Sequence, residues 1–166
     1  AMSNQGYKNV IEVISKGYRL GQVDGRLIIK RAWVEEFSED VIALSGGFVG
    51  EAGHLLGKYK TAEAKQRLQH WMQVFPDRFY IEVSRTFRSG EEDYLHAVVP
   101  LAAELDCPIV ATNDVRFMKR EDFEAHEARV CIFDGVTLDD PRRERRYSEE
   151  QYFKSSEEMA ELFSDL

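Results

Sequence analysis

The chain has 166 residues, with 22 basic and 30 acidic side chains and a formal net charge of −8. This length suits one domain with a sizeable core, and so acidic a surface disfavours independent binding to the phosphate backbone of DNA or RNA. No apolar run approaches the roughly 18–20 residues that span a bilayer, and we recognise no signal peptide. We therefore expect a cytoplasmic protein without membrane contact, in which Cys107 and Cys131 are reduced core residues.

The first half of the chain alternates between helical spacing and short apolar runs. The elements predicted there are, in chain order, a helix over Asn9–Arg19, a short strand or extended connection over Gly25–Ile29, a strand over Val41–Leu44, a helix capped by Thr61 that stops before Pro76, and a half-buried strand over Arg78–Val83.

The second half continues the alternation. The predicted elements are a helix opened by a capping box of Ser89 and Glu92, a strand over Pro108–Ala111, a helix over Glu121–Phe133 closed by Asp134-Gly135, and two further capping boxes, Ser148 with Gln151 and Ser155 with Glu158. Three strand-then-helix units in series predict a largely parallel sheet. Periodicity alone leaves open whether the sheet belongs to an α/β barrel or to a small doubly wound fold.

The segment after the third strand carries the most chemistry. The apolar run over Pro108–Ala111 is followed by Thr112, Asn113 and Asp114, and residues at the C-terminal ends of parallel strands converge on one cleft. A histidine two residues after the aspartate would complete a pair of metal ligands. The chain has Arg116 there, and a permanently charged guanidinium cannot coordinate a cation. We therefore expect Arg116 to hold Asp114 in a structural ion pair.

Three further groups have both a functional and a structural interpretation. Ser45-Gly46-Gly47 is either a plain turn or a loop whose backbone approaches a ligand. Glu51 and His54 lie three residues apart on one helix face, so they are either metal ligands or ordinary surface residues. His126, with acidic neighbours on its helix, is either a ligand or a satisfied structural histidine.

The only basic run lies near the end of the chain. Arg142, Arg143, Arg145 and Arg146 either clamp a phosphate or an acidic partner, or form a solvated loop. The chain has no phosphate-binding Gly-Lys-Ser/Thr loop, no Ser-His-Asp order and no cysteine-rich metal pattern. Nothing in these motifs indicates a self-sufficient enzyme.

Nine ordered segments are spread over nearly the whole length of the chain. They are Gly6–Asn9, Leu44–Gly47, Phe75–Tyr80, Arg85–Thr86, Ala111–Phe117, Asp122–Glu127, Asp139–Arg143, Tyr147–Ser148 and Ser155–Met159. In this order they resemble the polymerase and histidinol phosphatase (PHP) domain of the alpha subunits of bacterial replicative DNA polymerase III.

The resemblance implies an α/β fold class, a partial PHP-type distorted (β/α)7 barrel that lacks the first strands. Residues 6–166 would be the C-terminal two-thirds of a PHP domain, and residues 1–5 a cloning remnant or a disordered start. Metal-binding members hold a trinuclear centre with His, Asp, Glu and Cys side chains. Gly47 stands where they carry cysteine and Arg116 where they carry histidine, whereas Asp114 is retained. Loss of a thiolate and an imidazole implies a vestigial site without metal.

The resemblance also implies a function for the larger protein, a DNA-directed DNA polymerase that replicates DNA by nucleotidyl transfer with Mg²⁺ bound outside this fragment. The fragment itself is expected to hold no cofactor, to be non-catalytic and structural, and to dock the proofreading exonuclease (epsilon) subunit and the rest of the polymerase III complex. DNA would be bound through the larger chain. The expected partner contacts are the arginines at 142, 143, 145 and 146. An exposed sheet edge is expected to favour self-association.

The alternative is an active metal-dependent phosphoesterase or 3′–5′ exonuclease of the PHP type. Glu51, His54, Asp114 and His126 would then supply the ligands, and a metal-bound hydroxide would attack phosphorus.

Overall fold

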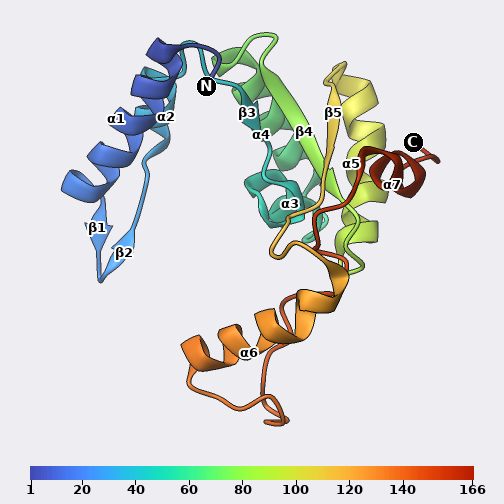
Figure 1. Cartoon of the computed structure of the whole chain (residues 1–166). Coiled ribbons are helices and arrows are strands. Elements are labelled where there is room, and N and C mark those ends of the chain that lie inside the picture. Colours follow the sequence, from blue (N-terminus) through green and yellow to red (C-terminus); the bar gives the residue numbers. More distant parts are fainter.

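The computed structural model describes residues 1–166, which form an N-terminal arm, a central α/β body and a protruding lobe (Figure 1). The arm (residues 1–37) contains α1 Asn4–Leu20, β1 Gln22–Val23, β2 Arg26–Leu27 and α2 Arg31–Glu36. The body contains β3 Ala43–Leu44, the 3₁₀ helix η1 Gly47–Val49, α3 Glu51–Leu56, α4 Thr61–Val74, β4 Phe79–Ser84, α5 Glu91–Leu105, β5 Ile109–Thr112 and the C-terminal helix α7 Ser156–Leu162. The lobe (residues 117–152) contains the 3₁₀ helix η2 Arg120–Asp122 and α6 Phe123–Asp134. None of these helices has the length and apolar content that crossing a membrane requires.

The arm consists of a long helix, a two-stranded hairpin and a short helix. α1 begins after Ser3, whose hydroxyl accepts the backbone N–H groups of Gln5 and Gly6 at 3.1 Å each. Because of this cap, the helix starts earlier than the predicted Asn9. Of the two alternatives for Gly25–Ile29, a short strand or an extended connection, the structure forms the strand β2, which pairs with β1 in an antiparallel hairpin.

The body is built on a parallel sheet with the strand order β3-β4-β5. Phe79, Ile81 and Val83 alternate along β4 and are buried in the core. Leu68 of α4 and Val98 of α5 pack in the same core, so the two helices cover one face of the sheet. The α/β class, the parallel sheet and the alternating strand over Arg78–Val83 are therefore confirmed.

The other face of the sheet has no covering helix. The apolar side chains of Ile42 and Leu44 lie on this face, and each is 45% exposed to solvent. The three strands form an open sheet that does not close on itself. The expected membership of a seven-stranded barrel is thus not confirmed by the sheet alone.

Two predicted helix caps are wrong. Thr61 is the first residue of α4, and its hydroxyl makes no capping bond to the helix. α5 starts after Gly90, at a φ of 88°, where Ser89 and Glu92 were expected to form a capping box. The reason is that the neighbouring Glu91 turns back to accept the backbone N–H groups of the preceding loop, which places the start of the helix at Gly90.

In the lobe and the C-terminal segment, the structure agrees better with the predictions made from the sequence. α6 ends at Gly135, whose φ of 69° suits glycine, as predicted. Ser155 and Glu158 form the predicted capping box of α7. Ser148 and Gln151 do share one bond, from the Ser148 N–H to Gln151 Oε1 at 3.0 Å, but a turn follows instead of a helix because the Gln151 side chain is fully buried. Both cysteines are buried and unpaired, as expected.

Candidate functional site

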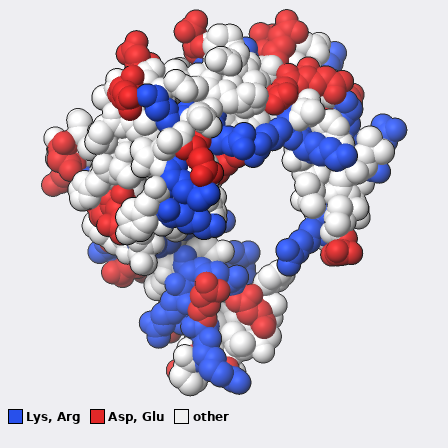
Figure 2. All heavy atoms as spheres, turned by 180° about the vertical axis from the view of Figure 1, so that it is seen from behind, with Lys and Arg blue, Asp and Glu red and all other residues white.

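A cleft of about 510 Å³ lies at the C-terminal ends of the three parallel strands. Gly47, from the loop after β3, lines one side, and Asp114 and Arg116, which follow β5, line the other. The structure thus places the three positions that the sequence singled out in one cleft. Figure 2 shows that Lys and Arg side chains gather along the rim of the open centre between arm, body and lobe, while many acidic side chains lie on the outside.

Asp114 is held by three donors. It follows β5 directly, at a φ of 44°, which aspartate tolerates better than most residues. Its Oδ1 lies 2.7 Å from Arg116 Nη2, and its Oδ2 lies 2.9 Å from Arg88 Nη1 and 2.8 Å from Gln151 Nε2. Two guanidinium groups and one amide therefore occupy both carboxylate oxygens. The positive charge that a metal ion would bring is already supplied by side chains.

Arg88 links Asp114 to a second, buried carboxylate. Its Nη2 lies 2.8 Å from Oε1 of Glu91, which is only 1% exposed. Glu91 also accepts the backbone N–H and the hydroxyl of Thr86, at 2.7 and 2.8 Å. A buried carboxylate is tolerated here because donors, including a guanidinium, surround its oxygens. We refer to Arg88, Glu91, Asp114, Arg116 and Gln151 as the Asp114 cluster.

The cluster fastens the C-terminal segment across the strand ends. Gln151 Nε2 donates to the backbone oxygen of Asp114 as well as to its carboxylate, at 3.1 and 2.8 Å. Asn113 Nδ2 donates to the carbonyl groups on either side of Gln151, at 2.8 and 2.7 Å. The Arg116 N–H donates to the Gln151 carbonyl at 2.8 Å. The polar residues after β5 therefore serve mainly to position residues 150–152.

Gly47 faces this cluster from a tight turn. Gly46 and Gly47 have φ values of 81° and 59°, and they lead into η1. A Cβ at Gly47 would meet nothing closer than Glu82 O at 3.9 Å. The cleft therefore has room for a side chain at this position, although the left-handed backbone disfavours one.

The four side chains of the expected alternative metal site do not come together. Glu51 forms ion pairs with Arg31 and, at 3.1 Å, with Arg67, beside a different pocket. His54 lies on α3 with its Nδ1 3.0 Å from the carbonyl of its own preceding turn. No three His, Cys, Asp or Glu side chains lie close enough to share a metal ion. The residues present do not fit a metal centre of the kind the family resemblance implies.

His126 is a buried residue of the lobe. Its ring packs against Tyr147, with centroids 4.7 Å apart, and against Phe117 at 5.5 Å. Burial, Arg129 and Arg116 lower its pKa, and Glu127 only partly opposes this shift. The Nε2 atom has no hydrogen-bond partner. The imidazole packs between two aromatic rings, but its buried Nε2 without a partner does not match the satisfied structural histidine that the sequence also allowed.

The arginine run divides into one buried and three exposed side chains. Arg143 pairs with Glu127, and both side chains are 7% exposed. This pairing raises the pKa of Arg143. Arg142 pairs with the adjacent Asp140 at 2.9 Å, Arg146 pairs with the last residue of α6, and Arg145 has no ion pair. The side chain of Arg143 is thus occupied by a buried ion pair within the lobe, so it is unsuitable as a contact for a partner protein.

Sequence reasoning missed three of the five residues of the Asp114 cluster. Arg88 and Glu91 lie in the loop after β4 and at the start of α5, where the chain was expected to form only a helix cap. Gln151 was assigned to a capping box. The available signal was the position of the first two just after a strand, because strand ends of one parallel sheet meet at the same edge.

Comparison with known proteins identifies the relatives of this chain. The family model described as PHP domain matches residues 1–86. The whole chain is 58% identical to a segment of DNA polymerase III subunit alpha from Pseudomonas aeruginosa, 48% identical to that of Escherichia coli K12 and 46% identical to that of Haemophilus influenzae. In each case all of this chain is covered, but only 14% of the relative.

Proposed function

The chain belongs to the PHP domain family, and we propose that it is a non-catalytic PHP domain of a DNA polymerase III alpha subunit. The observation that carries this proposal is the state of Asp114. Both of its carboxylate oxygens are engaged by guanidinium groups, so the one acid retained from the family's site is unavailable as a metal ligand. Without a bound metal, the cleft lacks a group that generates a hydroxide nucleophile.

The cluster's proposed role is structural. It joins the loop after β4, the loop after β5 and the C-terminal segment, which are distant in sequence. Opposite charges at the strand ends replace the cross-linking that metal ions provide in metal-binding relatives. The domain would then be a rigid scaffold within the larger polymerase.

We further propose that the sheet is part of the family's distorted barrel. The outer edges of β3 and β5 have no neighbouring strand, and the uncovered face carries half-exposed apolar side chains at Ile42 and Leu44. Such edges and faces are normally paired or covered. Additional strands of a longer polypeptide would pair with these edges and cover this face. Without such strands, the same edges would favour self-association.

The proposal for the whole protein follows its relatives. It would act in the cytoplasm as a DNA-directed DNA polymerase, with Mg²⁺ bound at a site outside this chain, and would contact DNA there. The PHP domain would dock the proofreading exonuclease subunit through exposed arginines. Arg142 and Arg145 are the best placed, because their side chains lie at the surface.

The docking proposal is tested by charge reversal. Arg142→Glu with Arg145→Glu, in the full-length subunit, should reduce co-purification of the cognate exonuclease subunit at least tenfold. Lys58→Glu, which changes an exposed lysine without an ion pair, should leave it unchanged. Equal retention by all three proteins would contradict this surface assignment.

The catalytic proposal is tested separately with bis(p-nitrophenyl) phosphate and millimolar Mn²⁺ or Zn²⁺. The chain should release no more p-nitrophenol than its Asp114→Asn variant. Release that is lost on this substitution would establish the metal-dependent phosphoesterase instead.

A further inference from the structure

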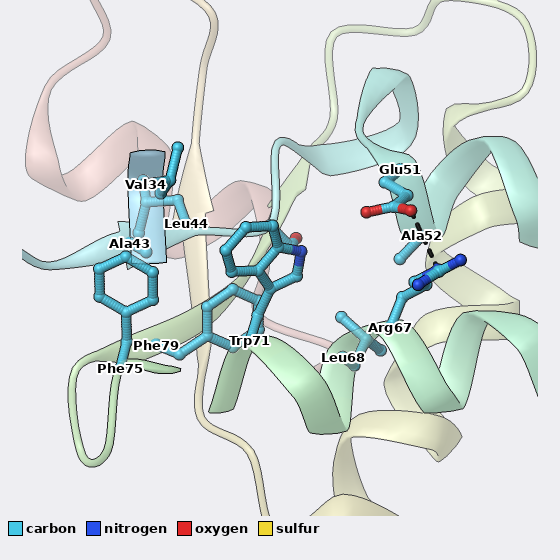
Figure 3. A pocket seen from close by; sticks show the side chains of 11 residues that line it. Val34, Ala43, Leu44, Glu51, Ala52, Arg67, Leu68, Trp71, Phe75 and Phe79 are labelled. Atoms are coloured by element: carbon cyan, nitrogen blue, oxygen red, sulfur yellow. Dashed lines mark ion pairs between the residues drawn. The ribbon is translucent and has the colours of Figure 1, made fainter. Parts of the chain in front are cut away.

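The body and the lobe expose apolar side chains in two different ways. The body has an apolar pocket of about 200 Å³ beside β3, in which Figure 3 shows Trp71 of α4 with Val34 and Leu44 on one side and Leu68 on the other. This pocket borders the outer edge of β3, which the proposed barrel assigns to further strands. The lobe instead carries two apolar side chains outward, on the last turn of α6.

These two residues, Ile132 and Phe133, form what we call the lobe tip. They are 81% and 89% exposed, although Val130 and Cys131 directly before them are buried. The apolar part of α6 thus continues beyond the stretch of helix that the lobe itself covers. Single exposed apolar residues are common, but two adjacent ones exposed to this degree at the end of a helix indicate an interaction site.

The base of the lobe holds it in a fixed orientation. The Phe153 N–H donates to the Phe117 carbonyl at 3.1 Å, and Phe117 and Tyr152 form an isolated parallel bridge. The bond from the Arg116 N–H to the Gln151 carbonyl joins the same two segments. Figure 1 shows α6 protruding from the body beyond this base. A tip presented by a preorganised element loses little conformational freedom when it docks.

The shape and the charge of the lobe restrict what covers its tip. A side chain that is 89% exposed protrudes, whereas sites for small molecules are concave. The occupant must therefore supply the pocket itself. Residues 117–152 contain seven basic and ten acidic side chains, and this excess of negative charge opposes DNA and anionic membranes. The occupant that fits is a protein surface with an apolar groove.

The lengths of the relatives indicate where that surface comes from. This chain covers only 14% of each of them, so most of such a polypeptide lies outside it. A domain linked to the lobe through the same polypeptide meets the tip at an effective concentration that reaches the millimolar range. Further barrel strands pair with the edges of the sheet, and the lobe lies outside that sheet.

We propose that the lobe tip docks into an apolar groove on a domain of the same larger polypeptide outside the PHP barrel, and thereby fixes the PHP domain against that domain. The inference rests on the proposed function only in requiring the longer subunit, and it does not depend on the state of Asp114. It also uses different side chains from the proposed exonuclease contacts, which are exposed arginines.

The test places p-benzoylphenylalanine at Phe133 in the full-length subunit, which is then irradiated without other subunits. Mass spectrometry should find position 133 cross-linked, within one polypeptide, to a peptide outside the barrel. The same photoreactive residue at Tyr59, a 95% exposed position of the body, should not reach that peptide. Cross-links from position 133 only to barrel strands, only to a second copy, or to the exonuclease subunit in its place once that subunit is added would overturn the proposal.

A second measurement uses Ile132→Gln combined with Phe133→Gln, which keeps good helix formers at both positions. In the full-length subunit, this variant should raise amide hydrogen exchange of the cross-linked peptide at least tenfold. In the 166-residue chain it should leave the midpoint of urea unfolding unchanged, because both side chains are exposed there. Met118→Gln, at a 68% exposed position of the same lobe, is the matched control and should change neither quantity.

Unchanged exchange in the double variant, or an equal rise in Met118→Gln, would contradict the docking of the lobe tip. Failure of the proposed function has a different readout, which is release of p-nitrophenol that depends on Asp114. The two failures are therefore distinguishable.

Discussion

Replacing Asp114 by asparagine tests the Asp114 cluster with little change of shape. Asparagine tolerates the left-handed backbone at this position, where φ is 44°, and keeps one acceptor oxygen. The loss of charge weakens two ion pairs. Arg116 is 42% exposed, so its pair contributes only about 0.5 kcal/mol after solvent screening. Arg88 is less exposed but keeps its pair with Glu91, and losing its second carboxylate costs about 1 kcal/mol.

Together these terms predict that Asp114→Asn lowers the free energy of unfolding by about 1–2 kcal/mol. The assay is urea unfolding at pH 7. When the dependence of the unfolding free energy on urea concentration has the same slope in both proteins, the difference between their midpoints reports the difference in stability. Asp77→Asn is the matched control, because Asp77 is exposed, has a φ of 58° and forms no ion pair. If the two variants lose the same stability, the charge network does not hold the strand ends together.

Four further predictions follow from individual contacts. Gly47→Ala should lower the free energy of unfolding by only about 1 kcal/mol, because the left-handed backbone at this position disfavours a Cβ. Gly50→Ala should lower it by about 3 kcal/mol in thermal unfolding, because its Cβ would lie 2.1 Å from a backbone oxygen. Burial lowers the pKa of His126 in the folded chain, so the unfolded chain binds a proton at a higher pH than the folded chain does. The free energy of unfolding should therefore be constant above about pH 6.5 and fall as the pH decreases below it. His126→Phe should flatten this pH dependence in urea titrations. Arg143→Met should lower the midpoint of urea unfolding, because its glutamate partner loses its counter-charge, whereas Arg145→Ala should leave the midpoint unchanged in the same assay. Light scattering at rising concentration should give masses above the 19.2 kDa of one chain, because two strand edges are free; a constant 19.2 kDa would contradict this.

Local patterns in the sequence predicted those features whose cause is local. The alternation along β4 and the glycine that ends α6 depend on neighbouring residues, and both are confirmed. The capping box of Ser155 and Glu158 is confirmed for the same reason. The same type of motif failed at Ser89, where the buried carboxylate of Glu91, two residues further on, determines the start of the helix.

The composition of the site depended on contacts between distant segments. Arg116 and Asp114 lie two residues apart, so their ion pair was accessible from the sequence. Arg88 and Gln151 reach the same carboxylate from 26 and 37 positions away. Only the parallel packing of the strands brings these segments together, and one sequence contains no direct signal of that pairing.

The most direct test of the account is the metal content of the chain after incubation with excess Zn²⁺ or Mn²⁺ and gel filtration. The account predicts far less than one equivalent, and no difference between the unchanged chain and Asp114→Asn, because arginines already hold this carboxylate. Nearly one equivalent of metal per chain, lost on the substitution of Asp114, would contradict it.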